Sequence, residues 1–378
     1  MPINSLKVYG YRSIKNIDLK LHDLNLVVGP NGSGKSNLYR CLQLIWSAAN
    51  GSLAATIANE GGMPSVMWAG ARSSNDPARM RFQIEVDDLA YILECGIIPL
   101  SAITEVKGEP WFSTDPDIKL EEVTTVKRDK RVKLLHRKRG LIEARGADGQ
   151  PIEFPILGNP FESVLASLRA PHLYPDLSRL RQEILDWRFY HHFRTDLSSE
   201  IRKEQTPVFT PVLSHDGHDL ASALASIIAT NGGYELNEHL QNAFPGAKLD
   251  IDMKPTEVSL LFEMPGLNRP FSARELSDGT LQYLCILAAL LTERPPNLMI
   301  LNEPETSIHP DLFDALAELL MVASKRSQIL VTTHARELAG GIVRRGGPKP
   351  IELEKKNGET RIVGAKLFSY DQDDDDRN

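Results

Sequence analysis

A glycine-rich octapeptide near the N-terminus has the residue types and spacing that hold phosphate groups. It runs from Gly29 to Ser36 and reads Gly-Pro-Asn-Gly-Ser-Gly-Lys-Ser, the full P-loop pattern. Glycines let backbone N–H groups converge on phosphate oxygens, and the positive end of the following helix points at the same place. The lysine supplies charge toward the β- and γ-phosphates, and the serine offers a hydroxyl to Mg²⁺. We predict that ATP binds here through Asn31, Gly32, Ser33, Gly34, Lys35 and Ser36, with Ser36 also at the metal.

A second candidate site is an apolar run that ends in acids, Leu298-Met299-Ile300-Leu301-Asn302-Glu303-Pro304. Such a run predicts a buried strand with polar side chains at its carboxyl end, which is the Walker B arrangement. Glu303 is placed to orient and polarise an attacking water. Asn302 stands where an Asp usually holds the Mg²⁺ shell, and it keeps an acceptor oxygen but loses the charge. We predict that Asn302 contributes to the metal site and that hydrolysis is slow but real.

A third candidate, Ser277-Asp278-Gly279, directly precedes an apolar helix that starts near Leu281. A helix N-terminus attracts anions, so this segment can contact a phosphate. On these residues alone, a plain serine N-cap is the favoured alternative. The position of the segment, just before the helix that leads into the Walker B run, instead favours phosphate contact.

A fourth candidate is His334, which follows the apolar strand predicted at residues 328–333. In this order along the chain, its imidazole can contact the γ-phosphate and the water held by Glu303. The alternative is a histidine that is simply satisfied within the core. We predict that Glu303 and His334 are the catalytic residues.

Hydrophobic periodicity indicates which elements position these motifs. Residues 24–28 predict a strand that runs into the glycine loop, and residues 36–47 have helical spacing. Between residues 79 and 145 the pattern alternates, which predicts an antiparallel sheet. Helical patterns then dominate. We expect four parts: residues 1–162 with the loop and the sheet, 163–247 as a mainly helical insertion, 248–368 with the remaining motifs, and 369–378 as a disordered acidic tail.

Composition and charge exclude several classes of protein. The net charge of −7 argues against a protein that coats nucleic acid over its whole surface. The run from Lys127 to Arg139 is basic, however, and is open to two interpretations, a solvated hairpin face or a nucleic-acid contact. The N-terminus has no secretory signal, and no apolar run reaches the roughly 18 residues of a membrane span. Three cysteines in apolar stretches indicate buried free thiols. We expect a cytoplasmic protein with no membrane partner.

Taken in order, these motifs resemble those of the ABC ATPase family. Residues 29–37, which end in Asn37, are similar to the RecF/SMC-like branch, as are residues 302–310 and Tyr11-Arg12-Ser13-Ile14. The resemblance covers about residues 1–46 and 271–340. It implies an α/β fold, in which an ABC-type P-loop NTPase core carries an antiparallel β-subdomain and a helical insertion. It also implies that Arg12 and Asn37 help to hold the nucleotide, and that residues 306–309 form a D-loop that crosses to a second subunit.

The resemblance further implies an ATP-dependent switch. ATP would lie between two copies of the chain, with Ser277 of one copy touching the γ-phosphate held by Lys35 of the other, and hydrolysis would release the homodimer. The expected role is DNA repair or a related DNA transaction. The alternative is the regulatory ATPase of an anti-phage defence system that gates a separate nuclease or toxin effector. The motif sequences are similar to the RecF/SMC-like branch and not to membrane transporters, which disfavours a transporter subunit.

Two departures from the family pattern bear on the rate of hydrolysis. Asp278 replaces the second glycine of the signature, and Asn302 replaces the Walker B Asp. Both are expected to affect the speed of catalysis more than nucleotide binding. The glutamine of the family's Q-loop is not placed by the sequence, since Gln43 and Gln83 are only weak candidates.

Overall fold

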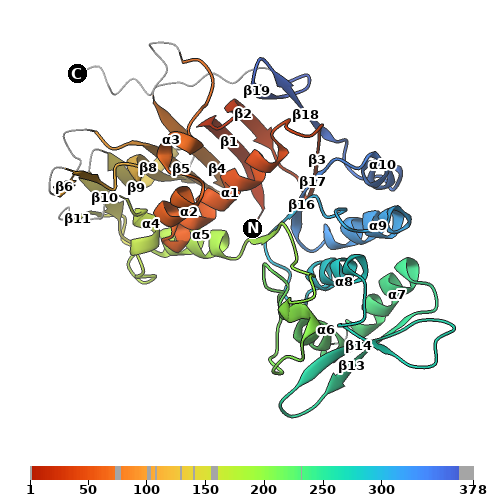
Figure 1. Cartoon of the computed structure of the whole chain (residues 1–378). Coiled ribbons are helices and arrows are strands. Elements are labelled where there is room, and N and C mark those ends of the chain that lie inside the picture. The colour runs from red at the N-terminus through yellow and green to blue at the C-terminus, as the bar shows by residue number, and fades with distance from the viewer. Residues whose placement is uncertain are drawn as a thin grey trace. The chain divides into compact units, whose positions relative to one another are not determined.

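The computed structural model describes residues 2–72, 78–99, 104–106, 109–127, 130–138, 141–154, 161–230 and 232–365. The chain forms two compact units, neither of which is continuous in sequence (Figure 1). Unit 1 comprises Met1–His22, Gly29–Trp187 and Glu352–Asn378, and unit 2 comprises Asp23–Val28 and Arg188–Ile351. The predicted acidic tail at 369–378 and residues 128, 129 and 139 of the basic run lie outside the described residues.

Unit 1 is built on an antiparallel sheet with the strand order β11-β10-β9-β8-β5-β4-β1-β2. Alternation explains its two faces, since β4 buries Met80, Phe82 and Ile84, which are every second residue. A separate short hairpin pairs β6 (Thr104–Val106) with β7 (Glu109–Trp111). The strands of the main sheet are β1 (Ile3–Tyr11), β2 (Ile14–Lys20), β4 (Arg79–Val86), β5 (Leu89–Ile97), β8 (Pro116–Lys127), β9 (Lys130–Lys138), β10 (Leu141–Arg145) and β11 (Pro151–Phe154).

Helix α1 (Lys35–Asn50) follows the glycine loop and is the central helix of unit 1. It buries Leu38, Leu42 and Ile45, a spacing that places them on one face of the helix. Around it pack α2 (Leu53–Asn59), α4 (Val164–Ser167) and α5 (Pro175–Leu185), while α3 (Met63–Val66) contacts α2 and β5. The hairpin of β18 (Ile351–Lys356) and β19 (Glu359–Ile362) is tied to the β1–β2 turn by the Thr360 N–H, which donates to Ser13 O at 2.7 Å.

Unit 2 is centred on parallel strands in the order β12-β16-β17-β3. These are β12 (Arg188–Tyr190), β16 (Leu298–Asn302), β17 (Gln328–Thr333) and β3 (Leu24–Val28). Strands β16 and β17 are buried along their whole length, as expected for parallel strands that are covered on both faces. Strand β3 is joined to the glycine loop of unit 1 by the chain itself, because Gly29 follows Val28 directly.

Helices and a small antiparallel sheet complete unit 2. Helix α8 is buried from Leu281 to Leu290, and it packs against α6, α7 and α9. The small sheet has the order β13-β14-β15. The elements are α6 (Leu220–Ala229), α7 (Gly233–Ala243), α8 (Asp278–Leu290), α9 (Phe313–Ala323), α10 (Arg336–Arg344), the short 3-10 turns η2 (Glu200–Arg202) and η3 (Pro310–Leu312), and strands β13 (Lys248–Met253), β14 (Val258–Glu263) and β15 (Phe271–Ser272).

The predicted α/β class is confirmed, with an antiparallel sheet in one unit and parallel strands in the other. Cys41, Cys95 and Cys285 are buried free thiols, as predicted. Within the described residues, no helix is long and apolar enough to cross a membrane. The four-part division of the sequence, including the mainly helical insertion at 163–247, stays a prediction.

Candidate functional site

The glycine loop is shaped by close backbone approaches that exclude larger residues. Gly34 has φ +107°, and a Cβ there would lie 2.2 Å from Thr360 Oγ1. A Cβ on Gly29 would lie 2.6 Å from both Leu353 O and Ser33 Oγ. Real Cβ atoms do not make such contacts, so both positions require glycine. The β18–β19 hairpin therefore packs directly against the loop.

The polar side chains of the loop are gathered around its own backbone. Lys35 is buried, and its Nζ donates to Gly29 O at 2.8 Å and Pro30 O at 3.3 Å. Ser33 Oγ is buried and has no hydrogen-bond partner among the described residues. Ser36 is exposed in the first turn of α1. A buried hydroxyl without a partner needs an explanation, and a phosphate oxygen would supply the missing bond.

Asn37 and Arg12 have partners within unit 1. Asn37 Nδ2 donates to Ser13 Oγ at 2.8 Å and so connects α1 to the β1–β2 turn. Arg12 has φ +49°, and its Nε and Nη2 donate to Glu60 Oε2 at 3.1 and 2.6 Å. Tyr11 donates to the same oxygen, and burial raises the pKa of its phenol, so Tyr11 stays a neutral donor. The carboxylate of Glu60 thus orients the side chain that the sequence associates with the nucleotide.

In unit 2 the parallel strands end at the same edge. Tyr190 is paired with Leu301, Asn302 with Thr332, and Thr333 with Val28. The residues that follow these four strands are therefore His191, Glu303, His334 and the first glycine of the loop. Two predicted catalytic residues and the start of the P-loop thus leave one edge of one sheet, which is where open α/β sheets bind ligands.

Glu303 leaves the strand with a left-handed backbone. Its φ is +52°, uncommon for a residue with a side chain, and its N–H donates to Thr332 O at 2.8 Å. Its carboxylate is partly exposed, and Oε1 lies 3.8 Å from His334 Nδ1. The two residues predicted to be catalytic are therefore neighbours.

Glu305 completes this cluster and was missed by the sequence analysis. Its Oε1 accepts hydrogen bonds from Thr333 Oγ1 at 2.6 Å and from the His334 N–H at 2.9 Å, and it lies 3.2 Å from His334 Nδ1. The Glu305 side chain is almost fully buried, whereas that of His334 is 48% exposed. The carboxylate fixes the turn that carries the histidine. Its signal in the sequence is a second acid two residues after Glu303.

Asn302 is buried and uses both ends of its amide. Its Oδ1 accepts from Thr332 Oγ1 at 2.8 Å, and its Nδ2 lies 2.8 Å from His191 Nδ1. The oxygen retains a second lone pair that a metal-bound water could use. His191 follows β12 and is exposed, and the parallel pairing of β12 with β16 brings it to the Walker B strand.

The signature segment has the local structure of an N-cap. Ser277 Oγ accepts from the Thr280 N–H at 3.1 Å, which caps α8, and the serine is exposed. A Cβ on Gly279 would lie 2.5 Å from Ser307 O, so the glycine allows the predicted D-loop to pass against the start of α8. Capping does not conflict with the predicted phosphate contact, because capping uses only part of the bonding capacity of the Ser277 hydroxyl.

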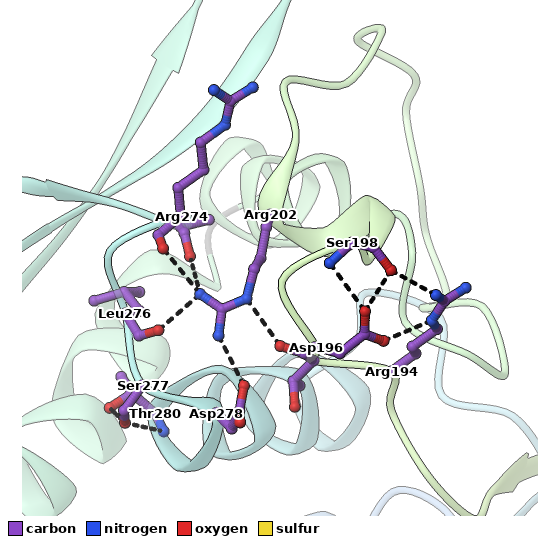
Figure 2. Close-up of polar contacts among 11 residues, drawn as sticks. Arg194, Asp196, Ser198, Arg202, Arg274, Leu276, Ser277, Asp278 and Thr280 are labelled. Carbon is purple, nitrogen blue, oxygen red and sulfur yellow. Dashed lines mark hydrogen bonds and ion pairs between the residues drawn. The ribbon is translucent and has the colours of Figure 1, made fainter.

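Arg202, at the end of η2, is a second residue that the sequence did not reveal. Its side chain is 6% exposed, and its guanidinium lies inside the turn that leads to α8 (Figure 2). Nη2 donates to Asp278 Oδ1 at 2.8 Å, and Nε donates to Thr195 O at 2.8 Å. Nη1 lies within hydrogen-bond distance of three carbonyl oxygens, those of Ala273 at 3.0 Å, Arg274 at 3.1 Å and Leu276 at 2.8 Å.

Comparison with known proteins gives a family match and more distant likenesses. Residues 24–338 match the family described as "AAA domain, putative AbiEii toxin, Type IV TA system". The phosphate import ATP-binding protein PstB of Malacoplasma penetrans (strain HF-2) is 29% identical over 101 residues, which are 24% of this chain and 34% of PstB. The chain thus matches only about a third of the length of that relative.

Two solved structures are similar over nearly the whole chain. The SMC head bound to the C-winged helix domain of ScpA has a TM-score of 0.51 at 15% identity, over 96% of this chain and 98% of that one. The SMC head domain from Thermotoga maritima has a TM-score of 0.45 at 16% identity, over 97% and 100%. At such an identity the first likeness shows the fold alone, that of a P-loop NTPase core. Since the family match spans most of the chain, the protein belongs to this AbiEii-type AAA-domain family.

Proposed function

We propose that this protein is a slow ATP-hydrolysing switch that dimerises when it binds ATP. The observation that carries the proposal is the shared strand edge, where Glu303, His334 and the start of the glycine loop follow aligned strands. ATP is held by the loop, with Lys35 moving from the loop carbonyls to the phosphates. The buried Ser33 hydroxyl gains an acceptor at the same time.

Two side chains carry the proposed chemistry at the Walker B edge, and a third holds them in position. Glu303, which is more exposed than Glu305, orients and polarises the attacking water. His334 lies between the two carboxylates, 3.8 Å from Glu303 and 3.2 Å from Glu305, and contacts the γ-phosphate. Glu305 does not reach the substrate in this scheme, because its Oε1 already accepts hydrogen bonds from Thr333 Oγ1 and from the His334 N–H.

A Mg²⁺ ion would arrive with the nucleotide, and the sequence assigns one donor in each unit to it. Among the described residues, no group of three or more His, Cys, Asp or Glu side chains could hold a metal alone. Ser36 offers an exposed hydroxyl, and Asn302 offers the second lone pair of Oδ1. Mg²⁺ suits this sparse set because it keeps several waters and binds phosphate oxygens. When bound, it would neutralise charge on the β- and γ-phosphates.

The proposed dimer places Ser277 of one copy against the γ-phosphate held by Lys35 of the other. Ser277 is exposed at the N-terminus of α8, so a second molecule can reach its hydroxyl and the nearby N–H groups. ATP then joins the two copies, and hydrolysis separates them. The predicted D-loop, residues 306–309, lies beside Gly279 and would cross to the partner together with the signature.

Two biological settings are consistent with this switch. A DNA transaction remains the first, although only part of the basic run can contact a ligand: Arg131 and Lys133 are exposed, whereas Arg137 is buried and donates to Glu162 O at 2.7 Å. The second is a defence system in which the ATPase gates a separate nuclease or toxin effector. The family description, which names a toxin and a toxin–antitoxin system, supports this second setting.

Dimerisation and turnover test the proposal together. Sedimentation of the wild type with ATP and Mg²⁺, with and without duplex DNA, should show an ATP-dependent dimer. Glu303→Gln should lower turnover by about 100-fold or more, as expected for loss of a general base, and should accumulate the ATP-bound dimer. Lys35→Ala should abolish tight ATP binding without unfolding the protein.

Glu238→Gln is the matched control, because that carboxylate is exposed on α7, and it should behave as the wild type. A wild-type protein that stays monomeric with ATP would contradict the switch. Turnover at the wild-type rate in Glu303→Gln would exclude Glu303 as the residue that activates water.

A further inference from the structure

The signature segment carries a charge that opposes its proposed role. Asp278 is the first residue of α8, and its side chain is 62% exposed. A γ-phosphate that approaches this helix end would meet a carboxylate, and two negative charges a few ångströms apart repel each other. The helix N-terminus can favour only one of the two anions fully. A dimer that closes on ATP therefore needs the charge of Asp278 to be neutralised.

Arg202 supplies that neutralisation from a different part of the chain. Its Nη2 donates to Asp278 Oδ1 at 2.8 Å, while the rest of the guanidinium is enclosed by backbone carbonyls (Figure 2). With 6% of its side chain exposed, Arg202 is held in place far more firmly than a surface ion-pair partner. The ion pair holds the carboxylate of Asp278 against the buried guanidinium of Arg202.

The surrounding charges do not compete for this arginine. Asp196 is close in sequence, but its Oδ2 accepts from Arg194 Nε at 2.6 Å and its Oδ1 accepts from the Ser198 N–H at 2.9 Å. Figure 2 shows this cluster to the right of the Arg202 guanidinium, whereas Asp278 lies below it. Asp278 is therefore the acid to which Arg202 is bonded in this region of unit 2.

The same guanidinium also fixes the backbone before α8. Its bonds to the carbonyl oxygens of Ala273, Arg274 and Leu276 span the turn that ends at Ser277. Three carbonyls that converge on one cation are mutually repulsive without it, because their negative ends point at the same place. Loss of the Arg202 guanidinium would therefore have two effects: it would loosen the turn, and it would leave the carboxylate of Asp278 unpaired.

We propose that Arg202 is a positioning residue of the signature, which neutralises Asp278 and sets the turn so that α8 can accept the γ-phosphate of ATP bound to a second copy. The inference rests on the proposed ATP-dependent dimer. It assigns to the segment from Thr195 to Arg202 a role in assembly, and it explains how a signature with an acid in place of glycine can still function.

A double-mutant cycle tests the inference, with the dissociation constant of the ATP-bound dimer measured in the Glu303→Gln background, where ATP persists. Arg202→Met should weaken the dimer at least tenfold, which corresponds to about 1.4 kcal/mol. Adding Asp278→Asn to Arg202→Met should recover at least threefold of that loss, because the unpaired charge is gone. Binding of ATP to the monomer should change less than twofold in all variants, because the glycine loop is a separate segment.

Arg194→Met is the matched control, since Arg194 is a 66% exposed arginine of the same segment, and it should dimerise as the parent does. No rescue by Asp278→Asn would overturn the neutralisation, because it would leave a purely structural role for Arg202. If Arg202→Met does not fold, Asp278→Asn alone decides, since it leaves the Arg202 charge free to attract phosphate. That variant should dimerise at least as tightly as the parent, and a tenfold loss would overturn the inference. A parent protein without any ATP-dependent dimer would instead contradict the proposed function.

Discussion

Glu305 offers a direct test of the Walker B cluster, because its removal should lower the stability of the fold, whereas removal of the exposed Glu238 should not. In Glu305→Ala, two strong hydrogen bonds disappear, from Thr333 Oγ1 at 2.6 Å and from the His334 N–H at 2.9 Å. A hydrogen bond to a charged group contributes about 1.5–3 kcal/mol, so the two contribute about 3–6 kcal/mol. The bond from the Ala335 N–H, at 3.3 Å, is long and adds little.

Desolvation reduces that sum. Glu305 is 4% exposed, and its Oε2 has no partner among the described residues, so the folded state holds a carboxylate that is only half satisfied. We therefore expect the lower bound, a loss of about 3 kcal/mol in the free energy of unfolding for Glu305→Ala. In Glu305→Gln the amide oxygen can still accept both bonds, and the expected loss is about 1 kcal/mol.

The assay is urea unfolding followed by circular dichroism, combined with hydrogen exchange at the His334 and Ala335 amides. Both amides should exchange faster in Glu305→Ala than in the wild type. Glu238→Ala serves as the surface control, because that carboxylate is exposed on α7, and it should not change stability by more than about 0.5 kcal/mol. A Glu305→Ala protein as stable as this control would refute the assignment of Glu305 as the acceptor that holds the turn.

Two further predictions concern the signature and the response to pH. Gly279→Ala should abolish ATP-dependent dimerisation but leave ATP binding to the monomer intact, since the new Cβ would lie 2.5 Å from Ser307 O and displace the D-loop; equal dimerisation of variant and wild type by sedimentation would contradict this. Burial, together with the nearby Arg188, lowers the pKa of His215, whose Nδ1 accepts from the Phe189 N–H at 3.0 Å. His215 therefore binds a proton more readily in the unfolded chain than in the folded protein. The contribution of the neutral His215 imidazole to stability is present above the ordinary histidine pKa and is lost as the pH falls below it. Urea unfolding at pH 7.5 and 5.5 should show a smaller pH dependence in His215→Leu than in the wild type, and an unchanged dependence would count against the buried neutral imidazole.

The sequence predicted the motifs well because each is a short run with its own pattern. The strand at 24–28, the helix after the glycine loop and the Walker B strand at 298–302 all appear where periodicity places them. The motifs also contain glycines that the structure requires, since Gly34 and Gly279 both have close contacts that forbid a Cβ. The roles of these residues toward ATP and Mg²⁺ stay predictions.

Residues that act across long separations could not be found from the sequence. Arg202 is 76 positions before Asp278, and nothing around it distinguishes it from a surface arginine. His191 approaches Asn302 only because β12 pairs in parallel with β16. The two units show the same limitation, since residues 23–28 belong with 188–351 in space although they lie within the N-terminal part of the sequence. Such partners depend on tertiary pairing, which a local pattern does not encode.

The burial of every cysteine makes this protein well suited to site-specific labelling. Burial raises the pKa of Cys41, Cys95 and Cys285, so almost none of their thiols is ionised at neutral pH. A maleimide dye should therefore leave the native protein unmodified and react with one introduced cysteine. Leu197 is 87% exposed and lies in the segment that leads to Arg202, so Leu197→Cys would carry a fluorophore close to the signature. Energy transfer between two such labels would follow assembly and release in real time, without any need to remove natural thiols first.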